Sequence, residues 1–306
     1  MSPGKVSITG AFSYSGAYIA EAYLAAGWEV QTLTRNPLRP HRLQGKIASF
    51  PLDFQNSDEL IESLNGVAVL INTYWVRFDY QHSSFEQAIN NSELLFNAAK
   101  IAGVKRIIHL SVSNPSIDSE LPYYAGKARV EEILEESGLA HSILRPTLIF
   151  GEEELLVNNI AWLMRKMPLF PIAGDGTFRL QPIYVRDLAK MALEEANKKT
   201  NRILNAAASE VLSYRQLLEI LKRISNSRSL FFQVPPWTAI ALARLMSIVL
   251  RDVLLTRDEL NGLMQERLYV GDECTKGVEF SRWAQENRQL LGRKYTNEIS
   301  RHHQSS

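Results

Sequence analysis

The chain has 306 residues, of which 45% are hydrophobic and 22% are charged, a balance that argues against intrinsic disorder. Its 34 Lys and Arg residues against 33 Asp and Glu residues give a formal net charge of +1, so nucleic acid is not expected as a partner. The single cysteine, Cys274, cannot form an intrachain disulfide, and the six histidines lack the spacing of metal ligands. We therefore expect a reduced globule with no metal site.

The first residues lead into a β-rich run at Lys5, which leaves no room for the apolar segment of a signal peptide. The most apolar stretch, residues 237–255, contains Arg244, Arg251 and Asp252 and is therefore a poor candidate for a membrane span. These patterns predict a cytoplasmic protein.

The first half of the chain alternates short β-rich runs with longer helical patterns, which is typical of a parallel sheet built from βαβ units. Gly27, Gly103 and Gly138 each follow a helical pattern, at the position where glycine often ends a helix. The predicted strands cover residues 5–9, 29–34, 47–52, 68–72, 106–110 and 142–144. The predicted helices cover residues 16–26, 58–64, 85–102 and 124–137.

The regular alternation of strand and helix patterns ends at Gly151. Prolines and glycines in the following segment predict a loop-rich region. The later predicted elements are a strand at 182–185, a helix at 187–196, a strand at 203–207 and a helix that begins at Tyr214. Together the patterns predict an α/β fold, a Rossmann-type doubly wound parallel sheet with a smaller, mostly helical C-terminal lobe. The predicted sheet domain covers residues 1–150 and 181–207, and the predicted lobe covers residues 151–180 and 208–306.

A glycine-containing turn, Thr-Gly-Ala-Phe-Ser-Tyr-Ser-Gly from Thr9 to Gly16, lies between the first predicted strand and helix. Gly10 permits a tight turn and Gly16 permits close packing of helix on strand, while the helix N-terminus suits a pyrophosphate. Ser13 replaces the middle glycine of the usual dinucleotide-binding pattern, and its hydroxyl offers a hydrogen bond instead. The candidate cofactor-binding residues of this turn are Gly10, Phe12, Ser13, Tyr14, Ser15 and Gly16.

Arg35 follows the second predicted strand, where an NAD-specific site places an acidic residue for the ribose diol. A guanidinium there suits the 2′-phosphate of NADP(H), although Arg39 would serve equally well and a solvated arginine is the alternative. We therefore expect NADP(H) rather than NAD(H). The ends of the third and fourth strands add the candidates Asp53, Phe54, Asn72 and Thr73, at the sheet edge where ligands bind in such folds.

Tyr123 and Lys127 are four residues apart near the start of one predicted helix, so they share a helical face. A neighbouring ammonium lowers the pKa of a phenol from about 10 and makes it a usable general acid or base. The spacing alone is common, but its position after a strand that ends in Ser111 and Ser113 is rarer. The candidate catalytic residues are therefore Tyr123, Lys127, Ser111 and Ser113.

With these motifs the chain resembles the short-chain dehydrogenase/reductase superfamily. It is most similar to the atypical branch that includes the nucleotide-binding accessory subunit of mitochondrial complex I and bacterial epimerase/dehydratase-like relatives. The resemblance covers roughly residues 5–277. It is carried by residues 9–16, Arg35, residues 123–127, LRPTLIFG at 144–151, QPIYVRD at 181–187 and LTRDE at 255–259.

The resemblance implies that Tyr123 donates a proton to a carbonyl, that Lys127 holds the nicotinamide ribose, and that Pro146 and Thr147 flank the nicotinamide. It also implies a helper serine that bonds the substrate carbonyl. The register of that serine falls near Val112, so the choice between the two neighbouring serines stays open.

The sequence is compatible with two functions. The first is an NADP(H)-dependent oxidoreductase or epimerase-like enzyme that acts on a small molecule the sequence does not identify. The alternative is a nucleotide-binding structural, assembly or redox-sensing protein without turnover. A structure in which Trp75 blocks the nicotinamide end would favour the alternative.

Three further features of the sequence have both a structural and a functional interpretation. Arg77 and His82 lie in an aromatic loop after the fourth strand, where exposed loop residues are favoured over a substrate contact. His109 lies in an apolar strand and is expected to be a core residue. Residues 237–250 predict an apolar helix, for which packing on the lobe is favoured over a partner interface or membrane-surface contact. A homo-oligomer is compatible with the sequence.

Overall fold

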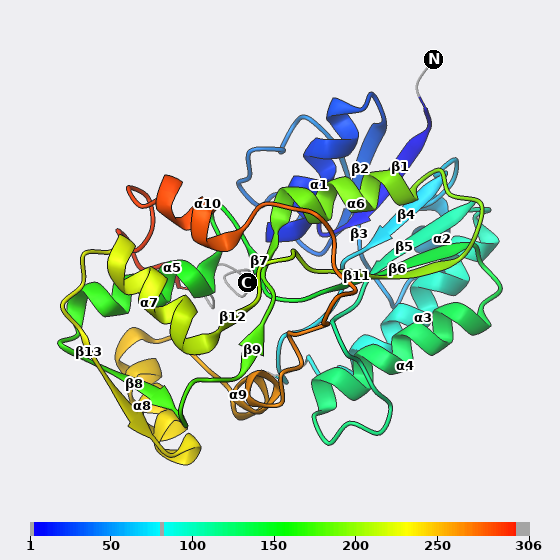
Figure 1. Ribbon diagram of the computed structural model, residues 1–306. Helices are drawn as coiled ribbons and strands as arrows, with labels where there is room; N and C mark the ends of the chain where they lie inside the picture. Colours follow the sequence, from blue (N-terminus) through cyan, green and yellow to red (C-terminus); the bar gives the residue numbers. More distant parts are fainter. Residues whose placement is uncertain (1–2, 80–82, 298–306) are drawn as a thin grey trace. The chain divides into compact units, whose positions relative to one another are not determined.

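The structure is a computed structural model that describes residues 3–79 and 83–297. The chain divides into two compact units, each built from separate stretches of the sequence (Figure 1). Unit 1 comprises Met1–Pro146 and Val185–Ala206, and unit 2 comprises Thr147–Tyr184 and Ala207–Ser306.

Unit 1 is built on a seven-stranded parallel sheet with the order β11-β6-β5-β4-β1-β2-β3. The strands are β1 (Lys5–Thr9), β2 (Glu29–Thr34), β3 (Ala48–Pro51), β4 (Val69–Asn72), β5 (Arg106–Leu110), β6 (His141–Pro146) and β11 (Arg202–Ala206). The strand order reverses between β1 and β4, and the carboxyl ends of strands at such a switch point are the usual ligand site. The predicted α/β, Rossmann-type doubly wound fold is confirmed.

Helices cover both faces of this sheet (Figure 1). On one face α1 (Tyr14–Ala25) packs against α6 (Val185–Glu195), and the Tyr23 hydroxyl donates a hydrogen bond to the Ala192 carbonyl at 2.9 Å. The other face carries α2 (Ser57–Ser63), α3 (Phe85–Ile101) and α4 (Pro122–Glu136). Their apolar side chains share one buried core with the strands. Because both faces are covered, nearly all residues of the central strands are buried, and the buried polar residues among them, such as Gln31 and Ser142, form hydrogen bonds.

The starts of these helices follow local sequence chemistry. The Ser84 hydroxyl caps α3 by accepting a hydrogen bond from the Gln87 amide, and the Asn56 side chain caps α2 in the same way. The helix α4 begins at Pro122, two residues before the predicted start, because a proline in the first turn needs no amide partner. The candidate pair of Tyr123 and Lys127 thus lies in the first turns of α4.

Unit 2 has its own apolar core, formed by α5 (Leu155–Lys166), α7 (Tyr214–Ile224) and α10 (Phe280–Glu286) around Phe150. Three two-stranded sheets accompany these helices and α9 (Arg257–Met264). The strand pairs are β7 (Ile149–Phe150) with β10 (Ile183–Tyr184), β9 (Arg179–Leu180) with β12 (Leu212–Ser213), and β8 (Leu169–Ala173) with β13 (Leu230–Val234).

The strands β8 and β13 were not predicted from the sequence. Pro171 lies inside β8, and a proline normally argues against a strand. A two-stranded sheet consists only of edge strands, however, so the missing amide of proline faces no partner strand.

The helix α8 (Pro236–Leu250) forms as predicted and packs on unit 2 through Ala239 and Ile240, but most of its surface is left uncovered. Among its side chains only Ala239 is buried, and Trp237 is 74% exposed. Apolar residues occur on all sides of this helix, so the sequence pattern alone does not show which side faces the core. Within the described part of the chain, no helix combines the length and apolar character needed to cross a membrane.

Candidate functional site

The turn after β1 has the geometry of an anion-binding loop. Gly10 has a φ of 72°, a left-handed conformation that suits glycine, and the Ser13 amide donates a hydrogen bond to its carbonyl at 2.8 Å. A Cβ on Gly16 would overlap the Gly10 carbonyl oxygen, so only glycine fits where α1 meets the turn. No side chain caps the N-terminus of α1, and its first turn has no acidic residue. The helix amides are therefore suited to a pyrophosphate.

The other residues of the turn anchor it or line its surface. The Phe12 ring is buried, with its centroid 5.2 Å from that of His41. The Tyr14 ring packs edge-on against Tyr18 at 5.6 Å, and Ser15 is half-buried. The two aromatic rings thus fix the path of the turn, which leaves its backbone and serine hydroxyls as candidate contacts for a ligand.

The candidates after β2 and β3 lie at the surface. Arg35 is exposed directly after β2 and forms no ion pair with any residue in the ranges 3–79 and 83–297. Asp53 is exposed and accepts a hydrogen bond from the Gln55 amide at 2.9 Å. The half-buried Phe54 ring packs against Tyr74, with centroids 5.0 Å apart. An exposed guanidinium is therefore available for a phosphate.

Asn72 and Thr73 already have protein partners at the switch point. The Asn72 side chain is fully buried, and its oxygen accepts hydrogen bonds from the Thr9 hydroxyl at 3.2 Å and the Tyr74 amide at 3.0 Å. Its Nδ2 lies 3.1 Å from His109 Nδ1. The Thr73 amide donates to the Thr9 hydroxyl at 2.8 Å. These residues tie β4 to β1, and their contact with a cofactor stays a prediction.

His109 is a core residue, as predicted. Its side chain is fully buried, and burial lowers its pKa well below the usual value, with a further decrease from the charge of Lys127. The neutral imidazole therefore supports Asn72 from the interior of the sheet.

Lys127 is buried at the carboxyl end of β5. Its ammonium donates a hydrogen bond to the Leu110 carbonyl at 2.8 Å, and only 3% of the residue is exposed. Burial lowers the pKa of Lys127 to about 7, although the nearby Glu131 carboxylate acts to raise it. A buried lysine that titrates near neutrality, one helical turn from the half-buried Tyr123, is typical of a functional site rather than of a solvated surface.

An aromatic group covers this lysine. The Lys127 ammonium lies 4.7 Å from the centroid of the Trp75 ring, a cation–π contact. Trp75 also stacks on Phe85 at 5.9 Å and meets Tyr123 edge-on at 6.2 Å. The Cβ that any other residue would place at Gly126 would approach Trp75 to 3.0 Å, so glycine makes room for the indole. Trp75 thus occupies the space beside the candidate catalytic pair.

The sequence pointed to Trp75 but not to the other members of this group. Phe85 was predicted only as the first residue of a helix, and Gly126 was given no role of its own. An isolated glycine inside a helix often indicates that a bulky group packs closely against that position. Gly126, which lies against Trp75, is such a glycine. In the preceding loop Arg77 lies over the Phe78 ring at 5.6 Å, whereas His82 lies outside the described residues.

The two candidate serines differ in their surroundings. Both are buried next to β5, where the Ser111 amide donates to the Leu144 carbonyl at 2.8 Å and the Ser113 amide to the Pro146 carbonyl at 2.9 Å. Between them Val112 packs in a cluster with Leu121 and the tyrosines of α4. The Ser111 hydroxyl is buried without a hydrogen-bond partner among the described residues, so it is the one with unused bonding capacity.

Pro146 and Thr147 fall on either side of the division between the units. Pro146 ends β6 in unit 1, and Thr147 opens the following stretch of unit 2. The Thr147 side chain is buried, and its hydroxyl donates a hydrogen bond to the Gln181 carbonyl of the same unit. A role for Thr147 beside a nicotinamide stays a prediction.

The buried ammonium gives a testable pH dependence. The pKa of Lys127 is about 7 in the folded chain and about 10.5 when unfolded, so between these values the unfolded chain binds more protons. The free energy of unfolding therefore rises with pH across this window, and Lys127→Met removes that contribution. From pH 7 to pH 9 we expect wild type to gain about 2 kcal/mol relative to Lys127→Met in urea titrations. The exposed Lys105→Met is the control, and parallel profiles for all three proteins would contradict the pKa of Lys127.

Residues 2–267 match the model of the NmrA-like family. The chain belongs to the NmrA-like family. The match covers most of both units and confirms the predicted resemblance to an extended, Rossmann-type dehydrogenase/reductase-like family.

Relatives of this NmrA-like protein include subunits of NADH dehydrogenase and a photosystem II assembly factor. It is 23% identical to NADH dehydrogenase [ubiquinone] 1 alpha subcomplex subunit 9, mitochondrial, of Arabidopsis thaliana, over 88% of this chain and 72% of that protein. It is 24% identical to Photosystem II assembly factor Ycf39 of Cyanophora paradoxa, over 76% and 72% of the two chains. The chain spans only 62% of the corresponding complex I subunit of Dictyostelium discoideum.

Solved structures with the same fold include reductases. The NADPH-dependent quinone oxidoreductase QOR2 of Escherichia coli, complexed with NADPH, matches 87% of this chain and 92% of its own, with a TM-score of 0.70 at 20% identity. The triphenylmethane reductase of Citrobacter sp., complexed with NADP(H), matches 93% and 99%, with a TM-score of 0.74 at 14% identity. At such identities these similarities establish the fold only.

Proposed function

We propose that this NmrA-like protein binds NADP(H) and acts as an oxidoreductase of the reductase- and epimerase-like type. The observation that carries the proposal is the buried Lys127, held at the end of β5 one helical turn from Tyr123, in a fold with a phosphate-type turn after β1. The structural neighbours that hold NADPH or NADP(H) support the choice of cofactor. The N-terminus of α1, which no side chain caps, fits the pyrophosphate, and Arg35, which has no ion-pair partner within residues 3–79 and 83–297, fits the 2′-phosphate.

The proposed chemistry assigns one task to each residue. When bound, the nicotinamide supplies or accepts the hydride. Tyr123 exchanges the proton with the carbonyl or alcohol oxygen of the substrate, and the ammonium of Lys127 favours the phenolate form. The Ser111 hydroxyl, which has unused bonding capacity, donates a hydrogen bond to the same oxygen. One side of the Lys127 ammonium already lies against the Trp75 indole.

The cofactor assignment is tested by thermal unfolding with each dinucleotide. NADPH at about 100 times its Kd should raise the Tm by about 5 °C, whereas NADH at the same concentration should have a much smaller effect. Arg35→Ala should weaken NADPH binding by about tenfold or more and leave NADH binding unchanged, because a charge-assisted pair with phosphate is lost. Arg39→Ala tests the neighbouring arginine, and the exposed Lys46→Ala is the control. The absence of a shift with either dinucleotide would overturn the proposal.

A second candidate function, nucleotide binding without turnover, is supported by the position of Trp75 over Lys127. Trp75 fills the space next to Lys127 and Tyr123, as expected of a chain that binds a nucleotide without turnover. The relatives in complex I and in photosystem II assembly fit such a structural or assembly role. A thermal shift with NADPH, combined with the absence of NADPH oxidation in the presence of carbonyl and quinone acceptors, would favour this second function.

A further inference from the structure

The helix α8 has an outer face that is unusual for a water-exposed helix. Its most exposed residues recur at helical spacing on one stripe, and they are Trp237, Ala241, Arg244, Leu245, Ile248 and Val249. Trp237, Ile248 and Val249 are 74%, 76% and 68% exposed, and α8 contains no acidic residue. A surface helix normally turns polar residues toward water, so this stripe has the character of an interaction surface.

The helix is held in place at both ends, so the exposure does not come from a frayed segment. Near its start Ala239 packs against Ala173 and Leu260. Beyond its end the buried Asp252 accepts a hydrogen bond from the Tyr295 hydroxyl at 2.5 Å, and Asn297 donates to the Leu250 carbonyl at 3.2 Å. The stripe is therefore presented by a fixed helix.

The apolar surface continues onto the small sheet of β8 and β13. In this sheet Phe170 and Phe231 pack toward the core around α7. Strand alternation turns their neighbours Leu169, Leu230 and Phe232 to the opposite side, which carries α8. These three side chains are 51%, 64% and 38% exposed. We call the stripe of α8 together with Leu169, Leu230 and Phe232 the apolar patch.

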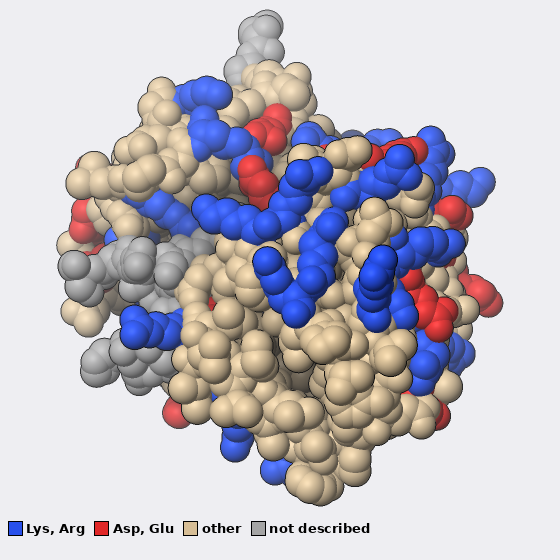
Figure 2. All heavy atoms as spheres, turned by 90° about the vertical axis from the view of Figure 1, so that its left-hand side faces the viewer, with Lys and Arg blue, Asp and Glu red and all other residues tan. Residues whose placement is uncertain are grey.

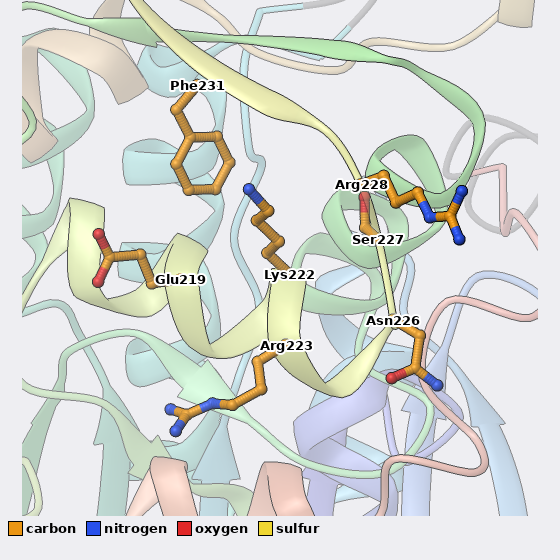
Figure 3. A pocket seen from close by; sticks show the side chains of 7 residues that line it. All are labelled: Glu219, Lys222, Arg223, Asn226, Ser227, Arg228 and Phe231. Carbon is orange, nitrogen blue, oxygen red and sulfur yellow. The ribbon is translucent and has the colours of Figure 1, made fainter.

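Basic side chains border the apolar patch. A depression of about 590 Å³ is lined by Lys222, Arg223 and Arg228, with Glu219 as its acidic member. It includes Phe231, which lies between the patch residues Leu230 and Phe232 along β13 but faces the α7 side of the small sheet. Figure 3 shows the Lys222 ammonium directed toward Phe231, while Arg223 and Arg228 point outward on different sides. The Lys222 ammonium lies 5.0 Å from the centroid of that ring. These charges do not converge on one centre, so they suit an extended anionic surface better than a single ion.

The charge around the patch is strongly one-sided. Residues 160–173 and 220–251 run from the ends of α5 and α7 through β8, β13 and α8, and they contain seven basic residues and no acidic residue, with Glu219 and Asp252 just outside these ranges. The whole chain has a net charge of only +1. In Figure 2 the part of the surface at the height of α8 in Figure 1 is almost free of charged side chains, and Lys and Arg side chains gather above it. An apolar area beside a basic border is complementary to acyl chains beside anionic headgroups.

We propose that unit 2 docks on the surface of an anionic lipid bilayer through the apolar patch, with the bordering basic residues at the level of the headgroups. Trp237 lies at the start of α8, and tryptophan favours the boundary between headgroups and acyl chains. The protein then sits on the bilayer without crossing it. A bilayer explains both the apolar stripe and the dispersed positive charge.

The test is co-sedimentation of the full chain with sucrose-loaded vesicles. We expect binding to vesicles of phosphatidylcholine with about one third phosphatidylglycerol and much weaker binding to pure phosphatidylcholine. The triple variant Lys222→Ala/Arg223→Ala/Arg228→Ala should lower the affinity by about 100-fold, because each basic residue near the surface contributes about a factor of five. The matched control removes three exposed lysines of unit 1, Lys46→Ala/Lys105→Ala/Lys198→Ala.

A second variant tests the apolar part of the surface. Ile248→Glu/Val249→Glu replaces two exposed side chains and should abolish vesicle binding while the far-UV circular dichroism and Tm stay at wild-type values. Ile101→Glu, at an equally exposed apolar position in unit 1, should bind vesicles as wild type does. Wild-type protein that does not bind anionic vesicles, or binding that the patch variants retain, would overturn the proposal. So would self-association that Ile248→Glu/Val249→Glu abolishes without any vesicle binding, because the patch would then join two copies of the chain.

Discussion

Tyr123→Phe is expected to lower NADPH-dependent turnover by about 100-fold or more while NADPH binding stays at its wild-type level. The substitution removes only the hydroxyl that exchanges a proton with the substrate, and general acid–base catalysis typically contributes a factor of about 10²–10⁴. The ring itself, and with it the edge-on contact to Trp75, remains. The reaction is followed as NADPH oxidation with 9,10-phenanthrenequinone as the probe acceptor.

The adjacent tyrosine provides a matched control. Tyr124 is buried and packs with Val112, and Tyr124→Phe should change turnover by less than about threefold, since its hydroxyl has no proposed part in the chemistry. Equal turnover in wild type and Tyr123→Phe would exclude the proposed proton transfer. Bound NADPH without any turnover in wild type would leave the nucleotide-binding structural role as the better description.

Gly16→Ala is the substitution with the largest expected effect on folding. Its Cβ would overlap the Gly10 carbonyl oxygen and approach the Ser13 hydroxyl to 3.0 Å, and the first of these is backbone that cannot rotate away. Either α1 or the turn has to shift, which costs about 3 kcal/mol in the free energy of unfolding. Urea titration measures this loss.

The same shift is expected to spoil the anion-binding geometry. The remaining folded Gly16→Ala protein should show no thermal shift with NADPH, because the amides of α1 no longer face the turn as in wild type. The control is Ser15→Ala, one residue earlier in the same helix, which should stay within about 0.5 kcal/mol of wild type. A Gly16→Ala protein with wild-type stability and NADPH response would contradict the close packing of α1 on β1.

The order of elements in unit 1 was predictable because each follows a strong local signal. The strands at Lys5–Thr9, Glu29–Thr34 and Arg106–Leu110 have the predicted bounds, since each is an apolar or β-branched run beside turn residues. The strands β8 and β13 were missed because their proline and exposed side chains carry no strand periodicity. For residues 237–250 the sequence left packing on the lobe, a partner interface and membrane-surface contact as alternatives, because a uniformly apolar helix does not show which of its sides meets the core.

The candidate site was predictable as a set of positions but not as a set of contacts. Glycines and polar residues at strand ends indicated where a ligand would lie. That Asn72 turns inward to His109, and that Trp75 lies on Lys127, depends on side chains distant in sequence. Such contacts follow from the packing of α3 and α4 over the sheet, which no local pattern encodes.

The path of the chain through the two units limits how the protein can be shortened or made in parts. The sheet of unit 1 is completed only by β11, which pairs with β6, and its face is completed only by α6, which packs on α1. Both elements follow Thr147–Tyr184 in the chain, a segment that belongs to unit 2. A ribosome that has released residues 1–146 has therefore made a sheet with an open edge at β6 and an uncovered α1. The nascent chain must keep this surface from aggregating until residue 206 has emerged.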